Sequence, residues 1–252
     1  HVILACGGAS YPSTGSDGNV FPIVRRLGHT IVPLKPALVG IDTDSCGDLQ
    51  GLTLKNVGVS LYLDQKKVAE EFGEMLFTHT GVSGPTILSL SSKANRYDFS
   101  VQKGKICIDL KPALTEQQLD ARILNDFAAM QNKEMKNALK DLLPQRLILP
   151  VLTQAEIPEN KKVNSVTAAE RQRLKRTLKS FSLTIRSLRP LAEAVVTSGG
   201  VDVSEVFPQN MKSRKIFNLS FAGEMLDTDA YTGGYNIQIA LSTGFLAGEK
   251  LA

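Results

Sequence analysis

Residues 221–227 read Phe-Ala-Gly-Glu-Met-Leu-Asp, residues 231–236 read Tyr-Thr-Gly-Gly-Tyr-Asn, and an amphipathic tail follows to Ala252. This order predicts a strand, an acidic turn and a helix that begins at a pair of glycines. The N–H groups at the start of such a helix point to one place, where the helix dipole favours a phosphate or another electron-rich ligand edge. The stretch therefore predicts one half of a nucleotide site.

The first eight residues, His-Val-Ile-Leu-Ala-Cys-Gly-Gly, resemble the other half of such a site. They predict a buried strand that stops at Gly7 and Gly8. Without a Cβ these glycines let a ligand approach the backbone, and Ala5 is small for the same reason. A strand that merely ends in glycines inside an ordinary sheet is the alternative interpretation.

Two carboxylates, Glu224 and Asp227, follow the end of the predicted strand at 216–222. Acidic residues at this place accept hydrogen bonds from ribose-type hydroxyls in dinucleotide folds, and ribitol hydroxyls offer the same donors. The alternative is that both acids only cap the helix near Gly233. Their closeness to the Gly-Gly-Tyr-Asn string favours a binding role.

The secondary structure that the sequence predicts changes three times along the chain. Residues 1–36 indicate a strand, a loop, a short helix around Ile23 to Leu27 that ends at Gly28, and an extended Thr30-Ile31-Val32. Residues 37–111 are mainly β, because apolar side chains alternate with polar or small ones as in half-buried antiparallel strands. The alternating positions are Val57, Val59, Leu61 and Leu63, and then Ile106, Ile108 and Leu110.

Residues 112–190 are mainly α. Thr115 and Gln118 form a capping box before a helix with Leu119, Ile123 and Phe127 on one face, and shorter helices follow, broken at Pro144, Pro150 and Pro158. Residues 191–252 return to α/β, with an apolar run at Ala194–Thr197. In the last helix the small residues Ala240, Gly244, Ala247 and Gly248 would let the backbone lie close to a sheet. The sequence thus predicts an α/β nucleotide-binding domain, residues 1–36 and 191–252, interrupted by an insert at 37–190.

Composition is that of a soluble globular protein. The chain has 252 residues, of which 42% are hydrophobic and 21% charged. No apolar stretch approaches the ~20 residues that cross a bilayer, and the start lacks the features of a signal peptide, so we expect a cytoplasmic protein with no membrane partner. Three widely spaced cysteines, Cys6, Cys46 and Cys107, predict reduced, mostly structural thiols and no metal site. No Ser/His/Asp triad is visible, so nothing supports a hydrolase.

The net charge of +4 is unevenly distributed. Residues 161–189 contain nine basic side chains against Glu170 alone, so this segment carries +8 and the rest −4. One interpretation is a surface for nucleic acid or an anionic cofactor. The other is a solvated helix face, because Thr167 and Glu170 form a capping box and Leu174, Leu178 and Phe181 make an apolar stripe. No aromatic residues interleave with the basic ones to stack bases, which favours the solvated face and makes nucleic acid an unlikely partner.

The stretch Thr78-His79-Thr80-Gly81-Val82-Ser83-Gly84-Pro85 is the best candidate for an element that faces a substrate. Histidine titrates near neutral pH, so His79 could act as an acid or a base. A lone histidine between threonines is also an ordinary structural residue, and Ser83-Gly84-Pro85 fits a turn that opens an apolar helix from Thr86 to Leu90.

These strings together resemble one bacterial family. Ala5-Cys6-Gly7-Gly8, Gly28-His29-Thr30, Thr78-His79-Thr80-Gly81 and Gly233-Gly234-Tyr235-Asn236 are similar, in this order, to the BaiN-like NAD(P)/FAD-dependent oxidoreductases, also called the aminoacetone-oxidase family of FAD-binding proteins. The resemblance covers the whole chain. It implies a glutathione-reductase-like FAD-binding domain with an inserted domain, which is β-barrel-like in one part and helical in the other.

The resemblance also implies roles for single residues. Ala5, Gly7 and Gly8 would line the middle of FAD, and Gly223, Glu224 and Asp227 would lie along its ribitol and pyrophosphate. The helix start at Gly234, Tyr235, Asn236 and Ile237 would point its N–H groups at the pyrimidine edge of the flavin, where reduction builds negative charge. The flavin would be reduced by NAD(P)H or by a small organic molecule.

Two departures from the family pattern bear on cofactor binding. The family's Gly-Ser-Thr-Gly-Asp-Gly loop reads Gly15-Ser16-Asp17-Gly18-Asn19-Val20 here, so the resemblance assigns no cofactor contact to this loop. No Gly-x-Gly-x-x-Gly turn is found in the 252 residues, although relatives begin with one to hold the ADP half of FAD. We therefore expect a fragment that lacks this N-terminal region and whose FAD binding is impaired.

Two functions remain open at this point. The first is an FAD-dependent oxidoreductase acting on a small-molecule substrate. The second is a nucleic-acid-binding or RNA-acting flavoprotein-like protein that uses the basic helix in residues 161–189, because flavoproteins that act on RNA share the fold.

Overall fold

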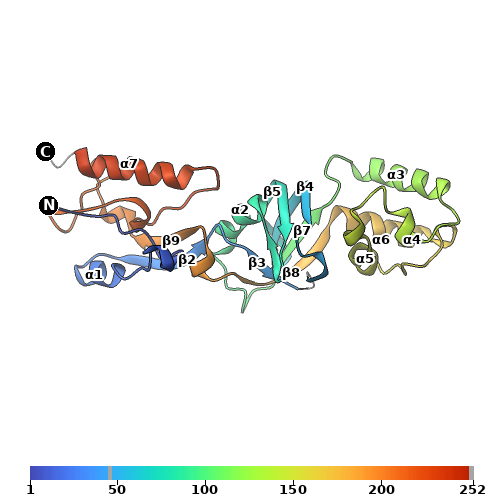
Figure 1. The fold of residues 1–252 in the computed structure, drawn as a ribbon, viewed down its shortest axis with the longest axis horizontal. Helices are drawn as coiled ribbons and strands as arrows, with labels where there is room; N and C mark the ends of the chain where they lie inside the picture. The colour runs from blue at the N-terminus through green and yellow to red at the C-terminus, as the bar shows by residue number, and fades with distance from the viewer. Residues whose placement is uncertain (45–46, 250–252) are drawn as a thin grey trace. The chain divides into compact units, whose positions relative to one another are not determined.

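The computed structural model describes residues 1–44 and 47–249, and its elements are labelled in Figure 1. The chain divides into two compact units. Unit 1 contains His1–Ile41, Ile87–Asp98 and the stretch from Ser187 onward, and unit 2 contains Asp42–Thr86 and Phe99–Arg186. Unit 1 thus includes Ile87–Asp98, which the sequence assigned to the insert. The predicted division at 36/37 and 190/191 stays a prediction.

Unit 1 joins the two ends of the chain through a parallel strand pair. Strand β1 (Val2–Leu4) pairs with β10 (Leu219–Phe221), with Ile3 opposite Ser220. Helices α1 (Phe21–Arg26) and α7 (Tyr235–Glu249) contribute Phe21, Val24 and Ala247 to the core around Phe221. The sequence predicted that the two ends of the chain belong to one α/β domain. The parallel pairing of β1 with β10 agrees with this.

A second pair in unit 1, antiparallel, is formed by β2 (Ile31–Ala37) and β9 (Val196–Val201). Strand β9 starts two residues later than the apolar run at Ala194 and continues through Gly199 and Gly200. Both glycines have positive φ, +96° and +128°. A Cβ at these positions would lie 2.4 Å from the Pro33 carbonyl oxygen and 2.6 Å from that of Met225. The glycine pair therefore permits a close backbone approach inside the strand.

Unit 2 is built on a closed barrel, with strand order β3-β6-β5-β4-β7-β8. This confirms the β-barrel-like part of the predicted insert. The strands are β3 (Ile41–Thr43), β4 (Thr53–Leu63), β5 (Lys66–Phe77), β6 (Gly81–Ser83), β7 (Gly104–Asp109) and β8 (Phe181–Leu188).

The apolar side chains of the predicted alternation point into the barrel. Val57, Val59, Leu61 and Leu63 are all buried on β4. Leu61 lies opposite Ile106, and Val59 lies opposite Ile108, on the neighbouring β7. The period of two along a strand is what placed these side chains on one face.

Helices fill the connections of the barrel. Helix α2 (Pro85–Ala94) follows β6, as expected from the turn at Ser83–Pro85. Between β7 and β8 lie α3 (Glu116–Ala129), α4 (Met135–Ala138), α5 (Gln145–Gln154) and α6 (Ala168–Lys179). The capping boxes predicted at Thr115 and Thr167 are both present, with each N-cap hydroxyl accepting the N–H of the third helical residue.

Two predictions in the helical part are wrong. Pro150 does not break a helix, since it lies inside α5; the burial of Leu147, Ile148 and Val151 offsets the lost backbone hydrogen bond. Phe181 does not extend the apolar stripe of α6, because that helix ends at Lys179 and Phe181 is the first residue of β8. Phe181 is nevertheless buried.

The helix end expected at Gly28 is confirmed: α1 ends at Arg26 with Leu27 as its C-cap, and Gly28 follows with φ of 94° and donates its N–H to the Arg25 carbonyl. Two predictions in unit 1 need correction. The strand expected over residues 216–222 is reduced to Leu219–Phe221. On α7 the small residues do not share one packed face. Ala247 is buried, and the Ala240 side chain lies 3.6 Å from an ideal Cβ of Gly223, whereas Gly244 and Gly248 face open space.

Cys6 is exposed, Cys107 is half-buried, and both thiols are free, while Cys46 lies outside the described residues. In residues 1–44 and 47–249 no helix combines the length and the apolar character needed to cross a membrane. No group of three or more His, Cys, Asp or Glu side chains in these ranges could hold a metal ion.

Candidate functional site

Unit 1 contains a cavity of about 470 Å³ at the start of α7. Its size is within the range of small-molecule sites. The cavity is lined by Leu38, Val195, Val196, Gly223, Glu224, Thr228, Tyr231, Thr232, Gly233, Gly234, Asn236, Ile237, Ile239 and Ala240.

The helix start at the cavity is held by one side chain. Gly233 and Gly234 have φ of +110° and +91°, a conformation that favours glycine. The Asn236 amide accepts the N–H of Ala230 at 2.8 Å and donates to the Ala230 carbonyl at 2.8 Å. Because the first N–H groups of a helix have no partner within the helix, this geometry presents donors to a ligand in the cavity.

Glu224 has a local structural role besides lining the cavity. Its carboxylate accepts the N–H of Thr197 at 2.5 Å and the hydroxyl of Ser10 at 3.4 Å. The Thr197 hydroxyl in turn accepts the N–H of Ala9 at 2.8 Å. The loop after β1 is thereby attached to β9, and the turn at Glu224 connects both to the cavity.

A buried hydroxyl in the cavity wall lacks a partner. The Oγ1 atom of Thr228 is buried and makes no hydrogen bond in the described structure, and the Oγ of Ser16, near Gly7, is in the same state. Buried polar atoms normally have partners, and an unpaired one costs about 1–3 kcal/mol. Since Thr228 lines the cavity, a ligand with polar atoms would satisfy it.

Asp227 lies beside the cavity rather than on its wall. Burial is the largest influence on this carboxyl group and raises its pKa above the usual value, against a hydrogen bond from the Gly199 N–H that lowers it. The charges of Asp229 and Asp202 raise the pKa further. Asp227 is thus attached to β9, and an additional donor from a ligand hydroxyl would favour its ionised form.

The predicted cofactor residues divide into two groups. Gly223, Glu224, Gly234, Asn236 and Ile237 line the cavity, whereas Ala5, Gly7, Gly8, Asp227 and Tyr235 do not. Gly8 is nevertheless close, because an ideal Cβ on it would lie 2.9 Å from the Glu224 carboxylate. Gly7 has φ of +78°. The assignment of all ten residues to a cofactor remains a proposal.

Sequence reasoning missed the apolar wall formed by Leu38, Val195 and Val196. These residues look like ordinary core positions in the sequence. Leu38 has a positive φ of 53°, which is rare for a branched side chain, but sequence gives no direct sign of it. The motif at 231–236 did contain Tyr231, whose ring lies 5.3 Å from the Lys93 ammonium. This cation–π contact places the Lys93 ammonium next to Tyr231, which lines the cavity.

His79 lies in unit 2, exposed, in the turn between β5 and β6. Its neighbours have structural roles. The Thr78 hydroxyl accepts the N–H of Gly81 at 3.1 Å, and the Thr80 hydroxyl donates to Asp42. The catalytic role of His79 stays a prediction.

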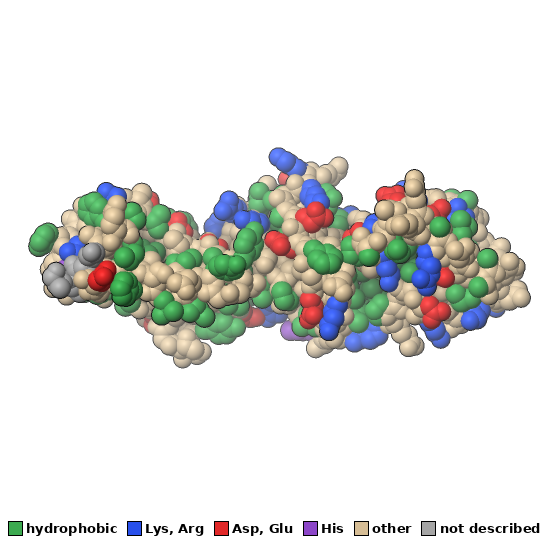
Figure 2. Space-filling view, turned by 90° about the horizontal axis from the view of Figure 1, so that it is seen from above, with side chains coloured by type: hydrophobic (Ala, Val, Ile, Leu, Met, Phe, Trp, Pro, Cys, Tyr) green, Lys and Arg blue, Asp and Glu red, His purple; other side chains and the backbone are tan. Residues whose placement is uncertain are grey.

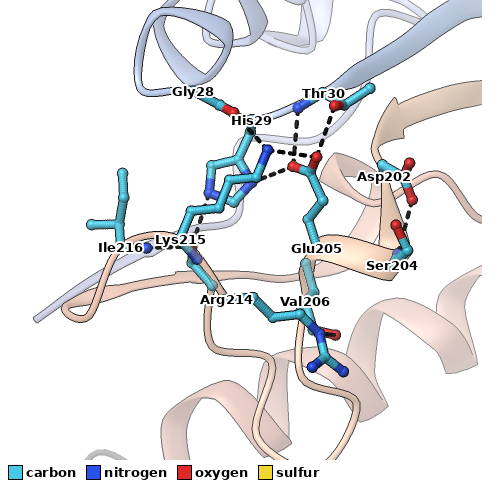
Figure 3. Close-up of polar contacts among 11 residues, drawn as sticks. Gly28, His29, Thr30, Asp202, Ser204, Glu205, Val206, Arg214, Lys215 and Ile216 are labelled. Carbon is cyan, nitrogen blue, oxygen red and sulfur yellow. Dashed lines mark hydrogen bonds and ion pairs between the residues drawn. The ribbon is translucent and has the colours of Figure 1, made fainter.

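A second histidine, His29, occupies a buried polar cluster in unit 1 (Figure 3). Its Nδ1 lies 2.9 Å from Glu205 Oε2, and its Nε2 lies 2.8 Å from Ser213 Oγ. Glu205 also accepts the N–H and the hydroxyl of Thr30, at 3.0 and 2.7 Å, and the Lys215 ammonium at 2.6 Å. This Ser-His-Glu arrangement was not visible in the sequence.

The cluster is structural rather than hydrolytic. Ser213 is 5% exposed, and its Oγ accepts the N–H groups of Lys215 and Ile216 at 3.0 and 2.9 Å. The hydroxyl is thus fully engaged, and a substrate could not reach it. The cluster fastens the 205–216 segment to the turn between α1 and β2.

The pKa values of His29 and Glu205 are both lowered, for different reasons. Burial, the largest influence, lowers the pKa of His29 against the opposing effect of Glu205, so the ring is neutral near pH 7. Burial raises the pKa of Glu205, but the hydrogen bonds from Lys215 and Thr30 outweigh it and hold the value at about 2.

The basic segment 161–189 is largely neutralised by neighbouring acids. Figure 2 shows blue and red side chains interspersed over the helical part, instead of a continuous blue face. Six of its nine basic residues form ion pairs: Lys161 with Glu170, Arg171 with Asp120, Arg173 with Glu156, Lys175 with Glu116, Lys179 with Asp109 and Arg189 with Glu193. This pattern is typical of a solvated helix face.

The chain also matches a known protein family. Residues 35–196 match the family model described as "HI0933-like protein barrel and H2TH domain". The chain belongs to this HI0933-like family. The matched range includes all six barrel strands and the helices α2 to α6. The family match thus agrees with the mixed α/β content and the closed barrel.

Three relatives match almost the entire chain. The chain is 31% identical over 252 residues to the 3-dehydro-bile acid delta(4,6)-reductase of Clostridium scindens, covering 100% of this chain and 62% of the relative. It is 29% identical over 252 residues to the ribosomal RNA dihydrouridine synthase of Escherichia coli, covering 99% and 60%. The enzyme of the same name from Haemophilus influenzae is 26% identical over 250 residues, with 97% and 58% covered. The chain spans about three fifths of these relatives.

Proposed function

We propose that this chain carries the flavin-facing part of an FAD site in a BaiN-like oxidoreductase, within a partial glutathione-reductase-like domain. The observation that supports this most is the cavity at the start of α7. It combines the first N–H groups of α7, which have no acceptor within the helix, glycines that leave the backbone accessible, and the unpaired hydroxyl of Thr228. A planar heterocycle with acceptor atoms along one edge fits this combination of donors and apolar walls.

The residues that line the cavity would have different roles in holding the flavin. Asn236 fixes the helix start, and the N–H groups that follow Gly234 would stabilise negative charge on the ligand edge. Leu38, Val195 and Ile237 would exclude water from the ring face. Glu224 and Asp227 would accept hydrogen bonds from ligand hydroxyls. When bound, FAD would supply two-electron transfer, with NADH or NADPH as the proposed reductant.

The names of the relatives suggest the type of reaction. One relative is named as a delta(4,6)-reductase, and the others as dihydrouridine synthases. Dihydrouridine is uridine with two added hydrogen atoms, so both names describe hydrogen addition to an unsaturated ring. We therefore propose reduction of a carbon–carbon double bond in a ring, with two electrons and two protons added.

A flavin titration tests this proposal. Because the 252 residues contain no Gly-x-Gly-x-x-Gly turn, we expect weak but saturable FAD binding, followed by quenching of flavin fluorescence. Asn236→Ala should weaken it clearly, whereas Gln238→Ala, at an exposed position of the same helix, should not. If neither FAD nor FMN shows saturable binding at about 1 mM, an affinity of only ~4 kcal/mol, the proposal is wrong.

A second candidate function concerns the substrate. Two of the relatives are named for an activity on ribosomal RNA. The ion pairs of Lys161 and of the α6 bases argue against helix α6 as the RNA contact. An RNA substrate would therefore need a surface of the chain other than this helix.

A further inference from the structure

The outer face of three neighbouring barrel strands carries a polar hollow. In the strand register Tyr62 of β4 lies beside Lys105 of β7, which lies beside Thr184 of β8. The next row is Ser60, Cys107 and Ser182. The hollow has a volume of about 640 Å³ and is lined by Tyr62, Asp64, Gln65, Lys103, Gly104, Lys105, Cys107, Ser180 and Thr184. We call this surface the β4–β7–β8 face.

The face has an excess of positive charge. Lys103 and Lys105 are exposed, and Arg186 is exposed one outward position beyond Thr184 on β8. None of the three forms an ion pair among the described residues, in contrast to most bases of residues 161–189. Asp64 is the carboxylate in the lining, and its oxygen accepts the N–H of Lys103 at 3.2 Å.

Glu70, which lies opposite Ser60 on the neighbouring strand β5, does not cancel this charge. Glu70 accepts the Lys67 ammonium at 2.6 Å and the Ser60 hydroxyl at 3.2 Å. At the opposite end of the face Asp109 is paired with Lys179 at 2.6 Å. The cations near Tyr62 therefore remain available to an external anion.

The shape of the face is stabilised from its edge. Asp64 and Gln65 form the β4–β5 turn with φ of 46° and 70°, both in the left-handed region. The Asp64 N–H donates to the Lys103 carbonyl at 3.1 Å, and Asp64 accepts the Lys103 N–H in return. These two hydrogen bonds hold the Lys103 backbone next to the hollow. The position of the Lys103 charge is therefore set by the β4–β5 turn.

The chemistry matches single-stranded nucleic acid. Lysine and arginine bind phosphates, a tyrosine ring stacks on a base, and hydroxyls of Ser180 and Thr184 can bond to sugar or base edges. A half-buried tyrosine beside unpaired cations is the combination absent from helix α6. We propose that the β4–β7–β8 face binds a single-stranded RNA segment, with phosphates at Lys103, Lys105 and Arg186 and a base on Tyr62.

This proposal rests on the second candidate function and is independent of flavin. Its test is fluorescence anisotropy of a labelled single-stranded oligouridylate of about 12 nucleotides, added to the flavin-free 252-residue chain. The test variant is the triple change Lys103→Gln, Lys105→Gln and Arg186→Gln. The control, Lys140→Gln, Lys162→Gln and Arg176→Gln, removes the same charge from exposed positions of unit 2.

We expect the test triple to weaken binding at least tenfold and to reduce the salt dependence of log K by about 2, since each phosphate contact contributes ~0.7. The control triple should change affinity less than threefold, which separates a local face from general charge. Tyr62→Leu should weaken binding about tenfold and Tyr62→Phe should not, because the phenyl ring still stacks. Circular dichroism melts establish that each variant is folded.

Several results would overturn the proposal: no binding by the wild-type chain, equal losses in the two triples, or equal affinity for a duplex. FAD titrations of the same variants keep the two proposals distinguishable. The face variants should bind FAD as the wild-type chain does, and loss of RNA binding with unchanged flavin binding supports the RNA face alone.

Discussion

An ideal Cβ on Gly8 would lie 2.3 Å from the hydroxyl oxygen of Thr197 and 2.6 Å from its Cβ. Gly8 lies in the loop that follows β1, and Thr197 lies on β9, so residues 189 positions apart meet where only glycine fits. The same Thr197 hydroxyl accepts the N–H of Ala9. Gly8, one of the two glycines that the sequence marked for ligand approach, is therefore also required by packing.

Gly8→Ala should destabilise unit 1 by about 1–3 kcal/mol, because the added methyl group forces Thr197 and Glu224 apart. Urea unfolding followed by circular dichroism measures this change. Gly244→Ala is the matched control: that glycine lies in α7 with nothing within 4 Å of an ideal Cβ. It should stabilise the helix by roughly 0.5–1 kcal/mol. Equal effects of both changes would contradict the packing role of Gly8.

Acid should destabilise the protein in two steps. The pKa of His29 is lowered by burial, so the unfolded chain takes up a proton first, and stability is lost as pH falls below about 6.5 toward the lower folded pKa. Glu205 has a pKa of about 2 in the folded protein and 4.5 ordinarily, so its contribution is lost between these values. Stability above pH 6.5 should be unaffected by either group.

His29→Gln tests the first step. The variant should be less stable at pH 7, because the bonds to Glu205 and Ser213 are altered, but its stability should change less between pH 7 and 5. Urea midpoints measured across this range give the comparison. His79→Gln is the control, since His79 is exposed. An unchanged slope in His29→Gln would mean that another group causes the loss.

The capping box of α6 offers a third prediction. Glu170 has its pKa lowered to about 2, first by the Lys161 ammonium at 2.7 Å and then by the Thr167 N–H. Thr167→Ala removes the N-cap hydroxyl and should cost about 1 kcal/mol in urea unfolding, whereas Thr167→Ser should retain most of that stability. A cost as large in Thr167→Ser would indicate lost methyl packing instead of lost capping.

The parts of the fold that follow from local rules were predictable from the sequence. Alternation placed Val57, Val59 and Leu61 inside the barrel, and the Thr-x-x-Gln and Thr-x-x-Glu boxes marked the starts of α3 and α6. Pro150 and Phe181 were misplaced because tertiary burial outweighed local propensity in one case and the helix ended earlier in the other. Closure of the barrel depends on long-range pairing, which no local pattern encodes.

The candidate site was predictable only where backbone geometry required a residue type. The glycines and Asn236 are fixed by positive φ and by the turn they hold, so they were recognised. Leu38, Val195 and Val196 were missed because an apolar wall has the same composition as a core. The His29 cluster was missed because its members lie 176 and 184 positions apart in the chain.

Thr228 provides a prediction in which stability and binding change in opposite directions. Its buried Oγ1 has no partner in the described structure and lies in the wall of the cavity. Thr228→Val keeps the shape and removes the unpaired hydroxyl, so the ligand-free chain should gain up to about 1 kcal/mol of stability. If the hydroxyl binds a flavin, the same change should weaken FAD about tenfold, since a hydrogen bond to a ligand of this kind is worth ~1 kcal/mol or more. Thr228→Ser, which keeps the hydroxyl, should retain FAD affinity. A stabilised variant with undiminished FAD binding would place the ligand elsewhere in the cavity.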